Sequence, residues 1–118
     1  MTYVDGFVLP VPEGNIDTYR EISEKAGKIW LEHGALQYRE CVADDVADKG
    51  FCRTFPDAVG TQDGETVIFA FIVYTSRAHR DAVNEKVMAD PRLKCDGETM
   101  PFDCKRMAYG GFKAIVDL

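Results

Sequence analysis

The spacing of hydrophobic and polar positions changes several times along the chain, and each change marks a predicted element. Residues 3–9 are β-prone and predict a first strand that ends at the Pro-Val-Pro run 10–12, where the missing amide donors interrupt a strand ladder. From residue 16 apolar side chains recur every three or four positions. This spacing predicts a helix over 16–33, with Asn15 as its N-cap and Gly34 just past its end.

The middle of the chain predicts two more strands. From Ala35 the period becomes two, which predicts a strand to residue 43. A polar connection over 44–65 follows, of a length typical of functional lids or partly disordered loops, with room for short extended pieces. The run 66–74 shows no alternation, so we expect both faces of this third strand to be shielded from water.

The last third of the chain predicts a second helix and a fourth strand. Ser76 is placed as an N-cap before a helical pattern over 77–89, which ends ahead of Pro91. Residues 104–109 predict the fourth strand, and the glycine pair 110–111 predicts a bulge or bend before an apolar tail. The predicted order is therefore βαββαβ.

This order predicts an α+β fold of the ferredoxin-like kind: a four-stranded antiparallel sheet with two helices on one face, formed by one domain over 1–118. Two helices can cover only one side of the apolar third strand. The other side would leave an apolar patch larger than monomers tolerate, so we expect a homodimer packed sheet face to sheet face. The alternative is that the long loop or the C-terminal tail folds back over this face.

Composition narrows the set of partners. With 118 residues and a net charge of −6, the chain is long enough for one core and lacks the basic balance of a nucleic-acid or anionic-membrane binder. It begins without a signal-like segment and holds no apolar stretch near the roughly 20 residues that span a bilayer, so we expect a cytoplasmic protein. The spacing of the four cysteines predicts reduced thiols and no metal site.

Several segments together resemble a known family. They are Tyr3 to Pro12, the Glu-His-Gly-Ala run 32–35 with Tyr38 and residues 40–45, residues 76–84 and 87–92, and residues 100–103 with 110–112. They resemble an uncharacterised bacterial family, the domain of unknown function DUF1428, of the dimeric α/β-barrel superfamily. The resemblance covers nearly the whole chain, and it implies a ferredoxin-like protomer whose sheet packs on a partner's sheet.

The resemblance implies no established mechanism. Members of the superfamily include cofactor-free monooxygenases, haem-degrading enzymes, muconolactone isomerase-like proteins and simple ligand binders, which commonly use a cavity between sheet and helices. Some relatives carry a label linking them to a signal-recognition-particle RNA. The acidic balance of this chain and the absence of a basic or stacking motif argue against an RNA-associated role here.

Histidine is the side chain best suited to proton transfer near neutral pH, and the chain has two. His79, in the first turn of the second predicted helix, is a candidate catalytic residue, and Ser76, Arg77 and the free amides there could hold an anionic ligand. The alternative is that Ser76 only caps the helix and the imidazole is exposed. His33 is a second candidate base, or else a helix C-cap.

Carboxylates within strands need a partner or a wet cavity, which makes Asp5 and Glu40 candidate acid–base groups. The polar groups expected in a sheet–helix pocket are Asp5, Tyr38, Glu40, His79 and Arg106. Alternatively, Glu40 and Arg106 form a cross-strand ion pair, which explains equally well why charged residues stand at these two positions.

Trp30 and Tyr19 could stack on an aromatic ligand or simply belong to the core. We therefore expect a small-molecule-binding homodimer without a cofactor, which acts as a cofactor-independent enzyme or binds its ligand without turnover. The alternative is a non-enzymatic dimeric module that binds another protein through its helices.

Overall fold

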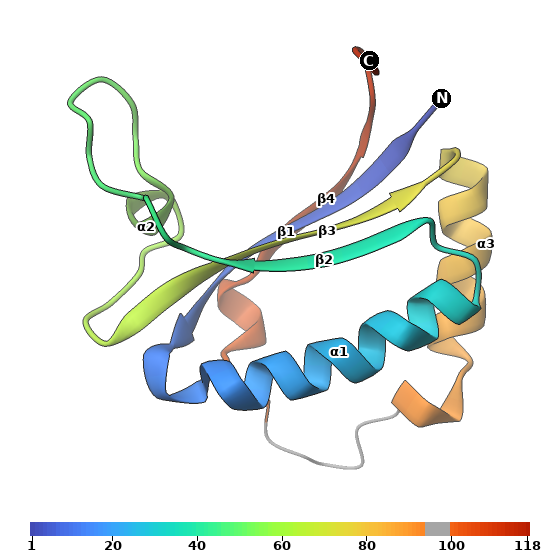
Figure 1. Ribbon diagram of the computed structural model, residues 1–118, viewed down its shortest axis with the longest axis horizontal. Helices are drawn as coiled ribbons and strands as arrows, with labels where there is room; N and C mark the ends of the chain where they lie inside the picture. The colour runs from blue at the N-terminus through green and yellow to red at the C-terminus, as the bar shows by residue number, and fades with distance from the viewer. Residues whose placement is uncertain (94–99) are drawn as a thin grey trace.

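Four antiparallel strands form one sheet in the order β2-β3-β1-β4, and the two long helices lie along one of its faces (Figure 1). The structure is a computed structural model that describes residues 1–93 and 100–118. Its strands are β1 (Tyr3–Pro12), β2 (Gln37–Val42), β3 (Glu65–Tyr74) and β4 (Ala108–Lys113), and its helices are α1 (Ile16–Glu32), α2 (Phe55–Ala58) and α3 (Arg77–Met88). Three short 3-10 turns cover Glu13–Asn15, Pro91–Leu93 and Cys104–Arg106.

The prediction that prolines end the first strand is wrong, because β1 continues through Pro10 and Pro12. Pro10 lies opposite Val67 of β3, and the carbonyl of Val67 instead accepts a hydrogen bond from the amide of Ala43, on the β2 side, at 2.8 Å. Pro10 therefore has no ladder bond to lose on that side. On its other side β4 pairs only as far as Val8, so the missing amide faces an open edge.

The central strand β3 separates two environments. Its residues Ile68, Ala70, Ile72 and Tyr74 face the helices and are all buried, where they join residues of β1 such as Leu9 in the core. On the opposite face Phe69 remains 43% exposed in the single chain. Shielding from water, which we expected for both faces, is thus supplied by the chain's own helices on one face only.

Both long helices begin where the sequence predicts. Asn15 precedes α1, although its side chain donates to the carbonyl of Pro101 at 2.9 Å and makes no cap bond. Gly34 follows α1 with φ +113°, a conformation that favours glycine. At α3 the Ser76 hydroxyl accepts a hydrogen bond from the amide of His79 at 3.1 Å, which confirms the predicted cap.

The fourth strand lies four residues later than predicted, over Ala108–Lys113, and residues 104–106 form a 3-10 turn. Gly110 and Gly111 make no bend before the tail but pair inside the strand with Gly6 and Asp5 of β1. A Cβ atom at position 111 would stand 2.8 Å from Cε1 of the Tyr3 ring. Gly111 therefore leaves room for the Tyr3 ring. The sequence around Gly111 does not reveal this contact, because Tyr3 lies at the other end of the chain.

The long connection between β2 and β3 carries one helical turn, α2, where we expected extended pieces. Thr54 caps this turn, and the ring of Phe55 meets the ring of Phe69 edge to face at 6.0 Å between centroids. The connection therefore covers one end of the open sheet face and leaves the rest uncovered (Figure 1). The C-terminal tail does not fold back over it either, since Ile115 and Val116 are exposed.

Within residues 1–93 and 100–118, none of the helices combines the length and the apolar character that crossing a membrane requires.

Candidate functional site

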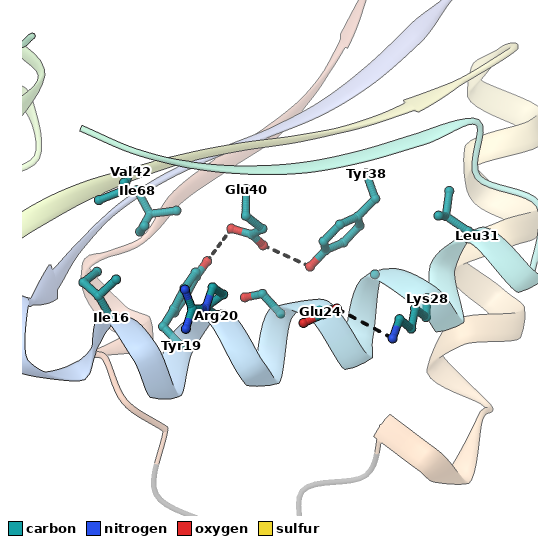
Figure 2. Close-up of a pocket in the computed structure, with 12 residues that line it drawn as sticks. Ile16, Tyr19, Arg20, Glu24, Lys28, Leu31, Tyr38, Glu40, Val42 and Ile68 are labelled. Atoms are coloured by element: carbon teal, nitrogen blue, oxygen red, sulfur yellow. Dashed lines mark hydrogen bonds and ion pairs between the residues drawn. The ribbon is translucent and has the colours of Figure 1, made fainter. Parts of the chain in front are cut away.

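A groove of about 560 Å³ runs between α1 and the edge strand β2 (Figure 2). Its size falls in the range of small-molecule sites, and most of its surface is apolar. The lining residues are Ile16, Tyr19, Arg20, Ser23, Glu24, Gly27, Lys28, Leu31, Tyr38, Glu40, Val42 and Ile68.

Glu40 lies in the middle of this groove, between two phenols (Figure 2). The Tyr19 hydroxyl donates to its Oε2 atom at 2.7 Å, and the Tyr38 hydroxyl donates to its Oε1 atom at 2.9 Å. Tyr19 is buried, and Tyr38 and Glu40 are half-buried. Helix and edge strand thus bring three polar groups together in an otherwise apolar groove.

Burial determines the electrostatics of this triad. Removal from water raises the pKa of Glu40, against the opposing effect of hydrogen bonds from Tyr19, Tyr38 and Ser23. Burial, followed by the adjacent Glu40 carboxylate, raises the pKa of both phenols well above the usual tyrosine range. The two tyrosines therefore stay protonated donors at neutral pH, and Glu40 holds a proton more readily than an exposed glutamate.

A second cavity of about 230 Å³ lies on the inner side of the triad and shares Tyr19, Ser23, Tyr38 and Glu40 with the groove. The rest of its lining is largely apolar and includes Phe7, Leu9, Ile22, Ala26, Trp30, Ala70, Ile72, Met100, Phe102 and Met107. The triad therefore separates an open groove from an inner apolar space.

Two residues that line the groove, Ser23 and Gly27, were not predicted as site residues from the sequence. They follow Tyr19 at intervals of four, so all three lie on the stripe of α1 that faces β2. A Cβ atom at Gly27 would stand 2.5 Å from Cδ1 of Tyr38, so this glycine makes the room in which the ring lies. A glycine inside a strong helical pattern is the signal that could have revealed this contact.

The predicted site residue Trp30 lies beside the triad. Its ring is tilted against that of Tyr38 with 6.1 Å between centroids, and its Nε1 atom donates to the Tyr74 hydroxyl at 3.1 Å. The structure therefore brings together four residues singled out from the sequence: Tyr19, Trp30, Tyr38 and Glu40.

Asp5 belongs to a different buried cluster, under the other end of the sheet. Arg80 donates to its Oδ1 atom at 2.6 Å and lies over the Tyr3 ring, 4.9 Å from the centroid. Burial raises the pKa of Asp5 despite the opposing charge of Arg80, and burial likewise raises the pKa of Tyr74 to about 12. Asp5 is not among the residues that line the groove.

His79, Ser76 and Arg77 lie apart from Glu40, at the start of α3. The His79 Nδ1 atom accepts a hydrogen bond from the Thr75 amide at 3.0 Å, and the ring meets that of Tyr74 edge to face. Ser76 and Arg77 border a separate open cavity of about 540 Å³ together with Lys113. These contacts give His79 and Ser76 capping roles in the structure.

The alternative pairing of Glu40 with Arg106 is wrong. Arg106 lies in the turn before β4 and donates to Glu65 at 2.7 Å and to the Gly60 carbonyl at 2.8 Å. The shift of β4 along the sequence takes Arg106 out of the sheet, so it cannot oppose a strand residue.

His33 ends α1 as its C-cap, and its Nε2 atom lies 2.8 Å from Oδ2 of Asp90. Arg92 donates to the same Asp90 oxygen at 2.7 Å. This cluster ties the end of α1 to the segment after α3. The thiols of Cys41, Cys52 and Cys104 are free and exposed, whereas the prediction for Cys95 lies outside the described residues.

These features define a small α+β protein with a phenol-bound carboxylate in a groove between a helix and a sheet edge. The chain belongs to the DUF1428 family, described as a protein of unknown function, whose profile matches residues 2–104. The resemblance noted from the sequence is thereby confirmed at the level of the family.

Curated relatives match almost the whole length of this chain. The chain is 51% identical over 117 residues to the uncharacterized protein YbaA of Escherichia coli (strain K12), with 99% of each covered, and it matches YbaA of Shigella flexneri equally well. Among solved structures it is similar to an uncharacterized NIPSNAP domain protein from Burkholderia xenovorans. That similarity has a TM-score of 0.55 at 13% identity and covers 95% of this chain and 93% of the other, so it concerns the fold alone.

Proposed function

We propose that this protein binds a small molecule in the groove between α1 and β2. The observation that carries the proposal is the position of Glu40, a half-buried carboxylate presented by two tyrosines in the middle of an apolar groove. Binding sites for small molecules combine an apolar lining with a few convergent polar groups in this way.

The triad also has the means for acid–base chemistry. A carboxylate offers about four acceptor positions, and the hydroxyls of Tyr19, Tyr38 and Ser23 occupy three of them, so a ligand can donate to the remaining one. Because burial raises the pKa of Glu40, this group can exchange a proton closer to neutral pH than an exposed glutamate. We therefore include in the proposal that the protein converts its bound ligand without a cofactor.

We propose further that the protomer is ferredoxin-like and pairs through its open sheet face, as members of the dimeric α/β-barrel superfamily do. The strand order, the two long helices on one face and the NIPSNAP-domain similarity support the fold. The exposed side chains of Phe69 and Phe112 support the pairing, because an apolar sheet face of roughly 800 Å² per partner suffices for a stable dimer.

We propose as well that the chain forms one domain, needs no cofactor and is located in the cytoplasm. Three exposed free thiols favour a reducing compartment.

The test is a thermal-shift screen with metabolite pools on two variants of the dimeric protein. Val42→Trp fills the groove, whereas Val116→Trp places the same ring on the exposed tail. A pool that stabilises the wild type and Val116→Trp but not Val42→Trp supports the groove as the site. Equal stabilisation of all three would place binding outside the groove, and the absence of any stabilising pool would favour the non-enzymatic interaction module.

A further inference from the structure

We propose that the ligand of this groove carries a positive charge: the site takes a small apolar amine, whose ammonium group is bound by Glu40. This inference rests on the proposed function and deepens it by naming the class of ligand.

The buried carboxylates of the chain differ in their partners. Within the part of the chain that the structure describes, four are buried or half-buried: Asp5, Glu40, Glu65 and Asp90. An arginine pairs with three of them, Arg80 with Asp5 at 2.6 Å, Arg106 with Glu65 at 2.7 Å and Arg92 with Asp90 at 2.7 Å. Each of these ion pairs neutralises the charge that folding removes from water.

Glu40 differs from the other three. Its hydrogen bonds come from the neutral hydroxyls of Tyr19, Tyr38 and Ser23, and no ion pair joins it to a described lysine or arginine. The burial that raises its pKa is thus not offset by a positive charge. A cationic ligand would supply the partner that the other buried carboxylates find within the protein.

The walls around Glu40 are also aromatic: the rings of Tyr19 and Tyr38 line the groove itself, and Phe102 and Trp30 lie behind them on the inner cavity. Tyr19 meets Phe102 edge to face with 5.5 Å between centroids, and Trp30 is tilted against Tyr38 at 6.1 Å. Aromatic ring faces attract ammonium groups, and the combination of several rings with one carboxylate suits an organic cation better than an anion.

The other charged groups near Glu40 do not replace such a ligand. On α1, Arg20 lies 3.3 Å from Asp17 and Lys28 lies 3.7 Å from Glu24, so each rim cation has an acidic neighbour. On β2, Arg39 alternates with Glu40 and lies opposite Phe71, so its side chain points to the open sheet face. Strand β3 contributes only apolar side chains to the two cavities: Ile68, Ala70 and Ile72. The net charge of −6 also favours the approach of cations.

The experiment compares three probes that share one ring and differ in charge: 2-phenylethylamine, 2-phenylethanol and phenylacetate. The fluorescence of Trp30, the single tryptophan of the chain, reports binding, because this side chain lines the inner cavity. We expect the amine to bind about tenfold or more tightly than the alcohol, as a charge-assisted hydrogen bond allows, and phenylacetate to bind most weakly.

Two variants test whether Glu40 causes the preference for the amine over the alcohol. Glu40→Gln should bind the amine and the alcohol with similar affinity, whereas Glu24→Gln removes one rim charge and should keep the preference. The amine affinity of the wild type should fall as the pH is lowered through the pKa of Glu40, while the affinity for the alcohol stays level. This comparison needs only the wild type, so it remains decisive if Glu40→Gln fails to fold.

Equal affinity for the alcohol and the amine, or tighter binding of phenylacetate, overturns the inference and leaves small-molecule binding in place. Failure of the wild type to bind any of the three probes overturns it as well, and the metabolite screen then decides the proposed function separately. Retention of the amine preference in a folded Glu40→Gln variant would show that another group recognises the charge.

Discussion

The ring of Tyr38 lies directly against the backbone of Gly27, so that a methyl group at position 27 would stand 2.5 Å from the Tyr38 Cδ1 atom. Helix α1 and strand β2 therefore approach each other where the helix has no side chain. The contact places the Tyr38 hydroxyl on Glu40 and leaves the groove open beside it.

Gly27→Ala should accordingly lower the stability of the protein and displace Tyr38. Overpacking costs about 1–3 kcal/mol, part of which the better helix propensity of alanine, about 1 kcal/mol, offsets. The matched control is Gly14→Ala, because a Cβ atom there meets nothing within 4 Å. Chemical denaturation measures both, and an equal effect of the two substitutions would contradict the role assigned to Gly27.

The raised pKa of Glu40 predicts a pH dependence of stability. A carboxyl group whose pKa is higher in the folded state than its ordinary value of 4.5 binds protons more tightly when folded. Its contribution to stability is therefore largest below pH 4.5 and is lost as the pH rises through the folded pKa.

Glu40→Gln should remove this dependence, so the variant gains stability relative to the wild type as the pH is raised from 4 to 7. The difference in unfolding free energy between the two proteins isolates Glu40 from the other acidic groups, including Asp5. A difference that does not change with pH would show that the carboxyl group titrates like an exposed one.

The buried pair of Asp5 and Arg80 is expected to matter more than ion pairs on the surface. Their side chains are only 9% and 17% exposed, so Arg80→Met leaves a buried carboxylate without its partner and should cost roughly 3 kcal/mol. Arg53→Met breaks a pair with Asp57 that is largely exposed and should cost less than about 1 kcal/mol. Similar losses in the two variants would contradict the burial argument.

Ser76 caps α3 through its hydroxyl, which accepts from the His79 amide. Ser76→Ala should destabilise the protein by about 1 kcal/mol, and Ser76→Asp should retain most of the stability. Neither substitution should change the affinity for a ligand in the groove, since Ser76 does not line it. A change in ligand affinity would instead support the anion site first considered at this helix start.

The open sheet face predicts the effect of charge on assembly. Phe69→Glu places a carboxylate among apolar residues of that face and should convert the proposed dimer into a monomer in analytical ultracentrifugation. Phe51→Glu is the matched control, because Phe51 lies in the long connection and is 83% exposed. A wild-type protein that stays a well-folded monomer at high concentration would refute the proposed pairing.

The sequence was informative wherever a local rule decided the structure. The helical spacing and the residues Asn15 and Ser76 located the starts of α1 and α3, and the unbroken apolar run located β3. Alternation also placed Tyr38 and Glu40 on one face of their strand, which in the structure is the face toward α1. Each of these properties depends on a few neighbouring residues and on one repeat, which a sequence displays directly.

Other features depended on residues far apart in the chain. Pro10 lies within a strand because neither neighbouring strand needs a hydrogen bond from its nitrogen, and in the pairing of β4 with β1 the backbone of Gly111 lies against the ring of Tyr3. Arg106 lies before β4 and pairs with Glu65, and Glu40 gains the Tyr19 hydroxyl from the packing of α1 on β2.

The sequence by itself therefore determined the kinds of elements, most of their ends and the strand face that Glu40 shares with Tyr38. Only the tertiary structure decided that Tyr19 joins Tyr38 on this carboxylate in place of an arginine, and that Gly27 opens the space beside it. The physical reason is that periodicity specifies the direction of a side chain, whereas its partner depends on the distance and register between elements that pack together.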